Sequence, residues 1–442
     1  MQGIARSAEV KRRMTLSNPS GLNVPVEGRS ALAKNTVAMV LIQAANYVFP
    51  LVLLPLFARQ LGLVEYGRLA FCFALIQTAG VFTDYGFGLS ASYRISKWKK
   101  RSSYVNRILS AVYFHKSCLS IACAIAVGIF ALSEDDVHLS QLLYWSIFAI
   151  LAQSLLPVWL FQGLERMAAL ASIILISRVA YFVPCLLLIR EANDSHIAII
   201  SLGTSQLIAG IGGAVLWRAA GYRWQWPGSR FARAVFYDST PFFASRASLL
   251  TYTSFGAVFL GLLAGPAQVA MYSAIEQLYR GAIGLVGMAS QALYPYMART
   301  RDFVLLARVV RGTLGLSCLA VIVALLFGEQ IIKVVYGDEF LSSSGMVPIF
   351  GIVFAITCPS IVLGYPFLAS VSRLSLANRS IYVAGIIQAM LLVILYIGGY
   401  ASAANVGMCV MIAEAAVLIL RVKWARQYWP NRAYFGGVCG RV

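Results

Sequence analysis

The sequence predicts an all-α membrane protein with about twelve transmembrane helices. Three observations support this fold class. Of the 442 residues, 60% are hydrophobic and only 12% are charged, whereas soluble domains carry roughly 25% charged residues. Twelve apolar runs follow one another along the chain. The length of each run is close to that of a helix that crosses a bilayer, about 20 residues. The Lys and Arg residues between these runs are concentrated on alternate sides, as the positive-inside rule requires.

Residues 1–34 are expected to form a basic cytoplasmic tail. This polar stretch holds several Lys and Arg residues, and the apolar run that follows starts too late for a secretory signal peptide. After the tail, each apolar run predicts one transmembrane helix. The predicted helices cover residues 35–57, 70–93, 108–131, 140–161, 170–189, 197–217, 240–264, 270–297, 312–335, 346–368, 381–400 and 403–424.

Both chain ends are predicted to lie in the cytoplasm. With this orientation, the segments on the cytoplasmic side hold 28 Lys and Arg residues, including Arg421 and the four that follow it, whereas the outer segments hold 4. A missed or additional helix would reverse this pattern for the rest of the chain. The formal charge of +19 therefore reflects membrane topology, and nucleic acid is not predicted as a partner.

A polar linker at residues 218–239 divides the predicted helices into two sets of six. The N-terminal lobe covers residues 35–217 and the C-terminal lobe covers residues 240–424, followed by a cytoplasmic tail at residues 425–442. The first helix pair of each lobe is joined by a similar turn. These turns are "LGLVEYG" at Leu61–Gly67 and "LAGPAQVAMY" at Leu263–Tyr272. Transporters are often built from two such repeated bundles.

The residue patterns that catalytic and metal sites require are missing from the sequence. The eight cysteines include no CxxC pair, the three histidines are scattered, and no glycine-rich phosphate loop occurs. We therefore predict neither an enzyme nor a bound cofactor.

Several segments resemble the Wzx-type polysaccharide flippases of the multidrug/oligosaccharidyl-lipid/polysaccharide exporter superfamily. The similarity extends over nearly the whole chain, and it rests on motifs that occur in order at matching helix positions. The motifs are "NYVFPLVLLPLFARQLGLVEYGRLAF" (Asn46–Phe71), "DYGFGLSASYRIS" (Asp84–Ser96), "WLFQGLERM" (Trp159–Met167), "VAMYSAIEQLYR" (Val269–Arg280), "LYPYMAR" (Leu293–Arg299) and "VVYGDEF" (Val334–Phe340).

This resemblance implies two six-helix lobes around a central cavity in a bacterial inner membrane. It also implies export of an undecaprenyl-pyrophosphate-linked oligosaccharide repeat unit (O-antigen, exopolysaccharide or capsule) by alternating access. A proton or sodium gradient is the expected driving force. Expected partners are the bilayer, the lipid-linked substrate, and a polymerase and glycosyltransferases of the same pathway.

Four cationic side chains lie inside predicted helices, where charge is costly and usually faces a protein interior or water. They extend from the cytoplasmic half of the membrane to its midplane, as contact with an arriving pyrophosphate would require. Two alternatives need no substrate: the cation nearest the midplane has Glu276 one turn earlier, and others can extend to the interface. The candidates for substrate contact, in order, are Arg280, Arg178, Arg246 and Lys116.

Three acids inside predicted helices are candidates for a coupling-ion site: Glu414, Asp84 and Glu276. Glu414 has no cation within one helical turn, and burial favours the protonated form of a carboxylate. The alternative is that these acids form structural salt bridges with the four cations.

Three other functions compete with that of a polysaccharide flippase. A multidrug exporter would favour acids over cations in its cavity, and a lipid II flippase commonly has additional helices. A membrane polysaccharide polymerase or ligase usually carries a large outer loop, whereas the longest outer loop here, about 328–345, is short.

Overall fold

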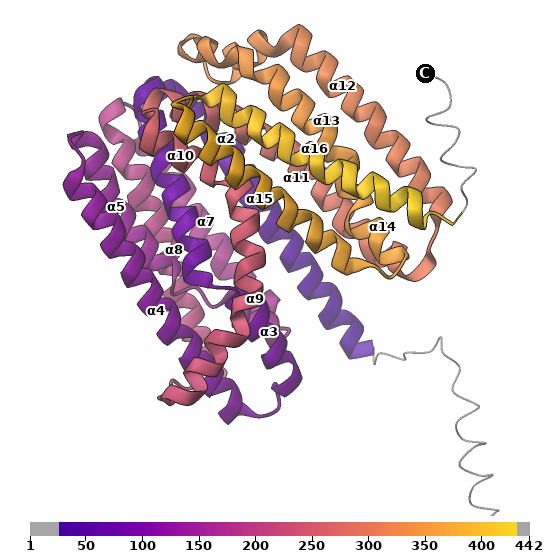
Figure 1. Cartoon of the computed structure of the whole chain (residues 1–442). Coiled ribbons are helices and arrows are strands. Elements are labelled where there is room, and N and C mark those ends of the chain that lie inside the picture. Colours follow the sequence, from indigo (N-terminus) through magenta and orange to yellow (C-terminus); the bar gives the residue numbers. More distant parts are fainter. Residues whose placement is uncertain (1–25, 431–442) are drawn as a thin grey trace, which may run out of the picture.

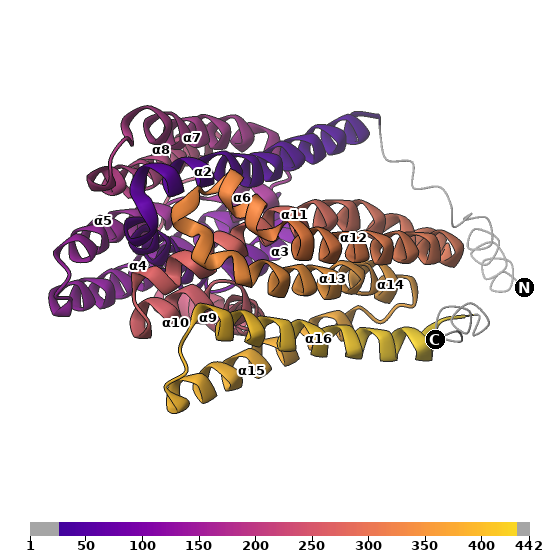
Figure 2. The same cartoon turned by 90° about the horizontal axis from the view of Figure 1, so that it is seen from above.

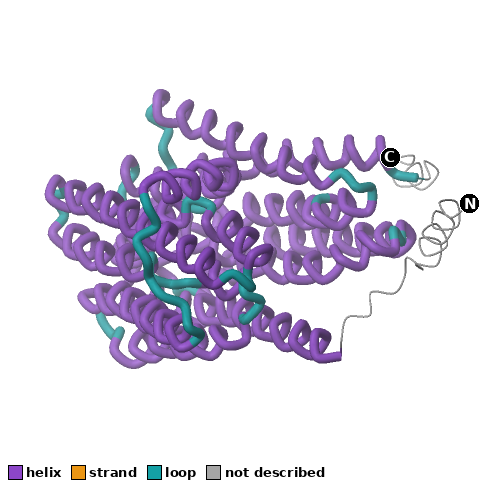
Figure 3. Tube along the Cα trace, turned by 90° about the horizontal axis from the view of Figure 1, so that it is seen from below, coloured by secondary structure: helices purple, strands orange, loops and turns teal. Residues whose placement is uncertain are grey.

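The computed structural model describes the backbone of residues 26–430, with side chains from residue 52 onward except those of residues 54, 252 and 253. This part of the chain is helical and contains no β-strand (Figure 3). The helices are α2 (Val26–Asp84), α3 (Phe87–Trp98), α4 (Ser102–Ser133), α5 (Val137–Gln153), α6 (Val158–Gly163), α7 (Met167–Leu188), η1 (Ala192–Asp194), α8 (Ser195–Ala219), α9 (Ser229–Thr253), α10 (Phe255–Leu263), α11 (Pro266–Thr300), α12 (Phe303–Val335), η2 (Asp338–Met346), α13 (Val347–Leu363), α14 (Tyr365–Ser370), α15 (Leu374–Gly398) and α16 (Ala403–Tyr428).

Each of the twelve predicted helices has a counterpart, which confirms a multi-pass α-helical protein. Nine helices of the described part are long and apolar enough to cross a membrane, or ten if the pair α9–α10, bent by 58°, counts as one span. The other two counterparts are α11, which carries more polar residues, and the first part of α2, where most side chains lie outside the described range.

Several helices are longer than the apolar runs that predict them. α2 begins at Val26, inside the predicted tail; α9 begins at Ser229, inside the predicted linker; and α16 continues to Tyr428. A helix ends where its backbone hydrogen bonding stops, which need not coincide with the edge of the hydrocarbon layer. The remainder of the two predicted tails, residues 1–25 and 431–442, lies outside the described residues.

The similar turns of the two lobes share one backbone conformation. Gly62 has φ 73° and ψ 174°, and Gly265 has φ 83° and ψ 171°, a region open essentially only to glycine. Three residues after each glycine, a side chain holds the start of the sixth helix of the same lobe. Glu65 accepts a hydrogen bond from the hydroxyl of Ser195 at the start of α8.

The corresponding residue of the second lobe is Gln268. Its Oε1 accepts a hydrogen bond at 2.8 Å from the backbone N–H of Ala403, the first residue of α16. The internal repeat suggested by the sequence is therefore present here as a shared local structure.

In Figure 1 the N-terminal lobe is purple and magenta, and the C-terminal lobe runs from rose (α9 and α10) through orange to yellow. Seen from above, the start of α2 and the end of α16 lie on the same side of the molecule (Figure 2). We call this side the terminal face and the other side the opposite face. The placement of the terminal face in the cytoplasm remains a prediction from loop charges.

At the opposite face, α2 of one lobe packs closely against α11 of the other. A Cβ atom at Gly67 would lie 1.9 Å from the carbonyl oxygen of Pro266, so only glycine fits this contact. Nearby, the backbone N–H of Leu63 donates to Glu339 Oε2 of η2 at 3.1 Å. The lobes are therefore held together at this face.

Near the terminal face, α9 connects the two lobes. It packs on α15 of its own lobe and on α3 and α4 of the other. The ring of Tyr85 stacks on that of Phe236 with centroids 4.2 Å apart, and the hydroxyl oxygens of Ser90 and Ser239 are 2.6 Å apart. Further contacts between α9 and the N-terminal lobe are the Arg94–Asp238 ion pair and the Tyr85–Phe243 ring stack.

Candidate functional site

Six of the seven predicted site residues line two separate cavities. The N-lobe cavity, between the N-terminal lobe and α9, is lined by Asp84, Lys116 and Arg246. The C-lobe cavity, inside the C-terminal lobe, is lined by Glu276, Arg280 and Glu414.

The N-lobe cavity has a volume of about 350 Å³ and receives side chains from both lobes. Lys116 of α4 is buried, with 6% of its surface exposed. A Cβ atom at Gly88 would lie 3.0 Å from Asp84 Oδ2 and 3.5 Å from Arg246 Nη2, so this glycine leaves space for both charged groups. Neither Lys116 nor Arg246 forms an ion pair within the described residues.

Neutral polar side chains that were not predicted as site residues also line the N-lobe cavity. Gln153, Gln162 and Gln206 come from α5, α6 and α8, and Trp159 lies beside them. A glutamine inside an otherwise apolar run could have indicated these positions from the sequence. Such a glutamine is uncommon because removing its polar amide from water is costly, as it is for a charged group.

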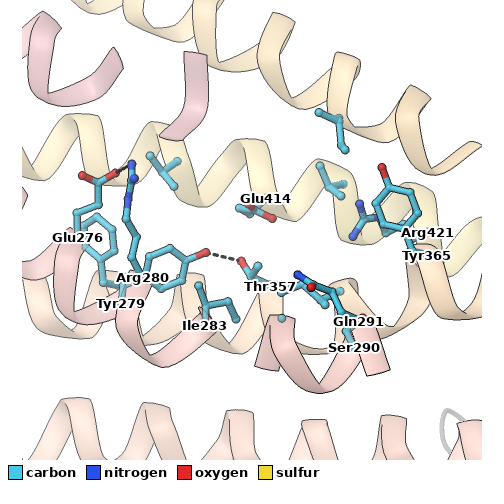
Figure 4. A pocket seen from close by; sticks show the side chains of 16 residues that line it. Glu276, Tyr279, Arg280, Ile283, Ser290, Gln291, Thr357, Tyr365, Glu414 and Arg421 are labelled. Atoms are coloured by element: carbon cyan, nitrogen blue, oxygen red, sulfur yellow. Dashed lines mark hydrogen bonds and ion pairs between the residues drawn. The ribbon is translucent and has the colours of Figure 1, made fainter. Parts of the chain in front are cut away.

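The C-lobe cavity has a volume of about 370 Å³ and is lined by α11, α13, α14, α15 and α16 (Figure 4). Arg280 Nη2 donates to Glu276 Oε1 at 2.7 Å, which confirms the pairing one turn apart that the sequence offered as an alternative. Farther along the cavity, the hydroxyl of Tyr279 donates to Thr357 Oγ1 at 3.1 Å.

Glu414 and Arg421 enter the C-lobe cavity from the same helix, α16 (Figure 4). Each has 8% of its surface exposed. Arg421, which the sequence analysis counted among the cytoplasmic cations, donates to the carbonyl oxygen of Ser360 at 2.7 Å and to Ser380 Oγ at 3.2 Å. Its spacing from Glu414 was the missed signal, because seven residues are two helical turns and place both side chains on one face.

The two cavities differ in their balance of charge. Two acids accompany the two arginines of the C-lobe cavity, whereas a single acid, Asp84, accompanies the two cations of the N-lobe cavity. A cavity with an excess of cations attracts an anion, and a cavity with carboxylates can bind a proton or a cation.

Arg178 of α7 lines neither cavity. Its Nε atom is buried and has no hydrogen-bond partner among the described residues. Contact between Arg178 and the substrate therefore stays a prediction.

Comparison with known protein families identifies the chain. The family model described as "Polysaccharide biosynthesis protein" matches residues 32–301, more than half of the sequence. The chain belongs to this family. For this polysaccharide biosynthesis protein, the matched region contains the charged residues of the N-lobe cavity and the Glu276–Arg280 pair. Glu414 and Arg421 lie beyond it.

Two curated relatives carry the same name, "Putative O-antigen transporter". The protein from Escherichia coli (strain K12) is 27% identical over 349 residues, which cover 78% of this chain and 82% of the relative. The protein from Shigella dysenteriae is 24% identical over 282 residues, covering 62% of this chain and 69% of the relative.

Solved structures show the same fold in two kinds of transporter. A structure of the lipid II flippase MurJ in an inward closed conformation has a TM-score of 0.68 at 12% identity, covering 89% of this chain and 87% of that one. An inward-facing multidrug resistance transporter of the MATE family has a TM-score of 0.57 at 13% identity, covering 90% and 97%. This polysaccharide biosynthesis protein therefore shares the helical fold of these transporters.

Proposed function

We propose that this protein carries undecaprenyl-pyrophosphate-linked oligosaccharide repeat units across the bacterial inner membrane by alternating access. The units would serve surface polysaccharide synthesis, supplied by glycosyltransferases and consumed by a polymerase. The observation that carries the proposal is the N-lobe cavity, where Lys116 and Arg246 face a single acid. Membership in the polysaccharide biosynthesis family and the names of the two relatives support the same substrate class.

The chemistry of a pyrophosphate suits this cavity. Arg and Lys donate charge-assisted hydrogen bonds to phosphate oxygens, and these bonds are strong where water is excluded. The excess of cations also disfavours a cationic drug, so the charge balance supports a flippase over a multidrug exporter.

A deletion strain tests this function. Loss of the gene should cause lipid-linked repeat units to accumulate on the cytoplasmic leaflet, and the wild-type gene should restore surface polymer. Intact surface polysaccharide in a deletion strain without a second copy of the gene would contradict the proposal. Rescue of a strain that lacks its lipid II flippase, with no rescue of polymer export, would indicate lipid II as the substrate instead.

We further propose that the C-lobe cavity couples transport to a proton or sodium gradient through Glu414, with Glu276 held by Arg280. Glu414 is buried and belongs to the cavity in which acids balance cations. Glu414→Gln keeps the shape of the side chain and removes its titratable charge. Transport by this variant should no longer respond to the coupling gradient.

The measurement is transport in vesicles with an imposed proton or sodium gradient, one ion at a time. Gln291→Asn, a change at another residue lining the same cavity, is the matched control, because it leaves Glu414 in place and adds no titratable group. If the Glu414→Gln variant keeps the gradient dependence of the wild type, Glu414 is not the coupling site.

Alternating access requires α9 to change its contacts, because this helix packs on both lobes. Ser90→Cys/Ser239→Cys should form a disulfide on mild oxidation, since the two hydroxyl oxygens are 2.6 Å apart and a disulfide needs close Cβ atoms. Transport should stop on oxidation and return on reduction. The two single variants serve as controls, and full transport by the cross-linked protein would show that α9 stays on α3 throughout the cycle.

A further inference from the structure

The internal repeat pairs a neutral residue of the N-lobe cavity with an acid of the C-lobe cavity. Ser195 and Ala403 begin α8 and α16. At corresponding positions, Glu65 accepts a hydrogen bond from the hydroxyl of Ser195 and Gln268 accepts one from the backbone N–H of Ala403. Eleven residues farther along these helices stand Gln206 and Glu414. Each lines the cavity of its own lobe.

The amides of the N-lobe cavity have unused hydrogen-bonding capacity. The side-chain amides of Gln162 and Gln206 form no hydrogen bond within the described residues. Gln153 donates from Nε2 to the carbonyl oxygen of Ile76 at 3.1 Å, which leaves its Oε1. Each amide offers donors on its nitrogen and an acceptor on its oxygen. The lining can therefore both donate to and accept from one ligand.

Two buried atoms of the same lining also lack protein partners. Trp159 Nε1, a donor, and Asp84 Oδ2, an acceptor, have no hydrogen-bond partner among the described residues. Buried polar atoms are normally hydrogen-bonded. These two atoms are enclosed by protein, so the hydrogen-bonding capacity at the cavity itself is that of the glutamine amides.

Phosphate groups, cationic groups and sugars differ in the hydrogen bonds and charges that they require from a binding site. Phosphate oxygens only accept hydrogen bonds and are served by Lys116 and Arg246, whereas a cationic group would require acids. A sugar hydroxyl donates and accepts, as a glutamine amide does. The volume of about 350 Å³ is at the lower end of the range for small-ligand pockets, so it suits a sugar residue rather than a whole repeat unit.

We propose that the N-lobe cavity binds the sugar attached directly to the pyrophosphate, with Gln162 and Gln206 hydrogen-bonded to its hydroxyl groups. This inference rests on the proposed function, and it makes the two glutamines determinants of substrate specificity. The repeat supplies the contrast, because the C-lobe cavity has an acid where the N-lobe cavity has Gln206.

Binding measurements on purified protein in nanodiscs test this proposal. The two probes are undecaprenyl pyrophosphate and the lipid-linked repeat unit extracted from the deletion strain. The wild type should bind the sugar-bearing probe more tightly, and Gln162→Leu/Gln206→Leu should reduce this preference roughly tenfold or more, since each neutral hydrogen bond accounts for about a fivefold change in affinity. Affinity for undecaprenyl pyrophosphate should stay within about twofold, which also shows that the variant is folded.

Gln388→Leu is the matched control. Gln388 is buried in α15, has no hydrogen-bond partner among the described residues, and lines neither cavity, so its replacement should leave the preference unchanged. A preference that survives in the double variant, or equal binding of both probes by the wild type, would overturn the sugar site. The proposed function is tested separately, by polymer export in the complemented deletion strain. Failure of the sugar site in the binding assay would leave that test unaffected.

Discussion

Lys116→Gln/Arg246→Gln should reduce polymer export by roughly 100-fold or more. Both cations line the N-lobe cavity, and Asp84 would remain there as an uncompensated negative charge. A hydrogen bond to a charged group contributes about 1.5–3 kcal/mol. Loss of two such bonds to the pyrophosphate corresponds to about 3–6 kcal/mol, or roughly 100- to 10,000-fold in affinity.

Export would be measured as surface polymer in the complemented deletion strain, normalised to protein in the membrane. Lys116→Arg, which keeps the charge, should retain much of the export. Arg308→Gln in α12, outside both cavities, is the control for loss of positive charge. Export near the wild-type level in the double variant would show that these cations do not hold the substrate.

Gly67→Ala should prevent the lobes from closing at the opposite face. The added Cβ would lie 1.9 Å from the carbonyl oxygen of Pro266, and a backbone atom cannot rotate away as a side chain can. α2 and α11 must then separate. Overpacking of this kind costs about 1–3 kcal/mol and applies only while the lobes are closed at this face, so the balance should shift roughly 5- to 150-fold toward the open form.

Accessibility of a cysteine placed at this contact measures the shift. In a background with the reactive native cysteines removed, Pro266→Cys should react faster with a membrane-impermeant thiol reagent when Gly67→Ala is present, and export should fall. Gly312→Ala is the control, since a Cβ atom at Gly312 would meet nothing within 4 Å. Unchanged labelling and export would show that the α2–α11 contact does not limit the transport cycle.

The sequence predicted the number of helices correctly because the signals for membrane helices are local. Each apolar run reflects the thickness of the bilayer, and the loop charges checked the count independently. The first and last residues of each helix were less predictable than the number of helices. α9 begins well before its apolar run, and its early residues Phe231 and Ala232 contact Tyr104 and His115 of α4, which no local signal reports.

The residues of the two cavities were predictable as individual intramembrane charges, but their grouping was not. Glu276 and Arg280 could be paired from the sequence because they lie one turn apart on one helix. Arg421 was assigned to the cytoplasm from its position near the end of an apolar run, whereas burial against Ser360 and Ser380 of other helices places it in the C-lobe cavity.

The sequence by itself determined that this is a multi-pass helical protein with an internal repeat and costly charges inside the membrane. Only the tertiary structure decided that α9 carries Arg246 to Asp84 and Lys116 of the other lobe, and that neutral glutamines surround them. The physical reason is that burying a charged or polar group is a local cost visible in any apolar run. The interactions that offset this cost come from side chains on helices far apart in the sequence, and only the packing of the fold brings those helices together.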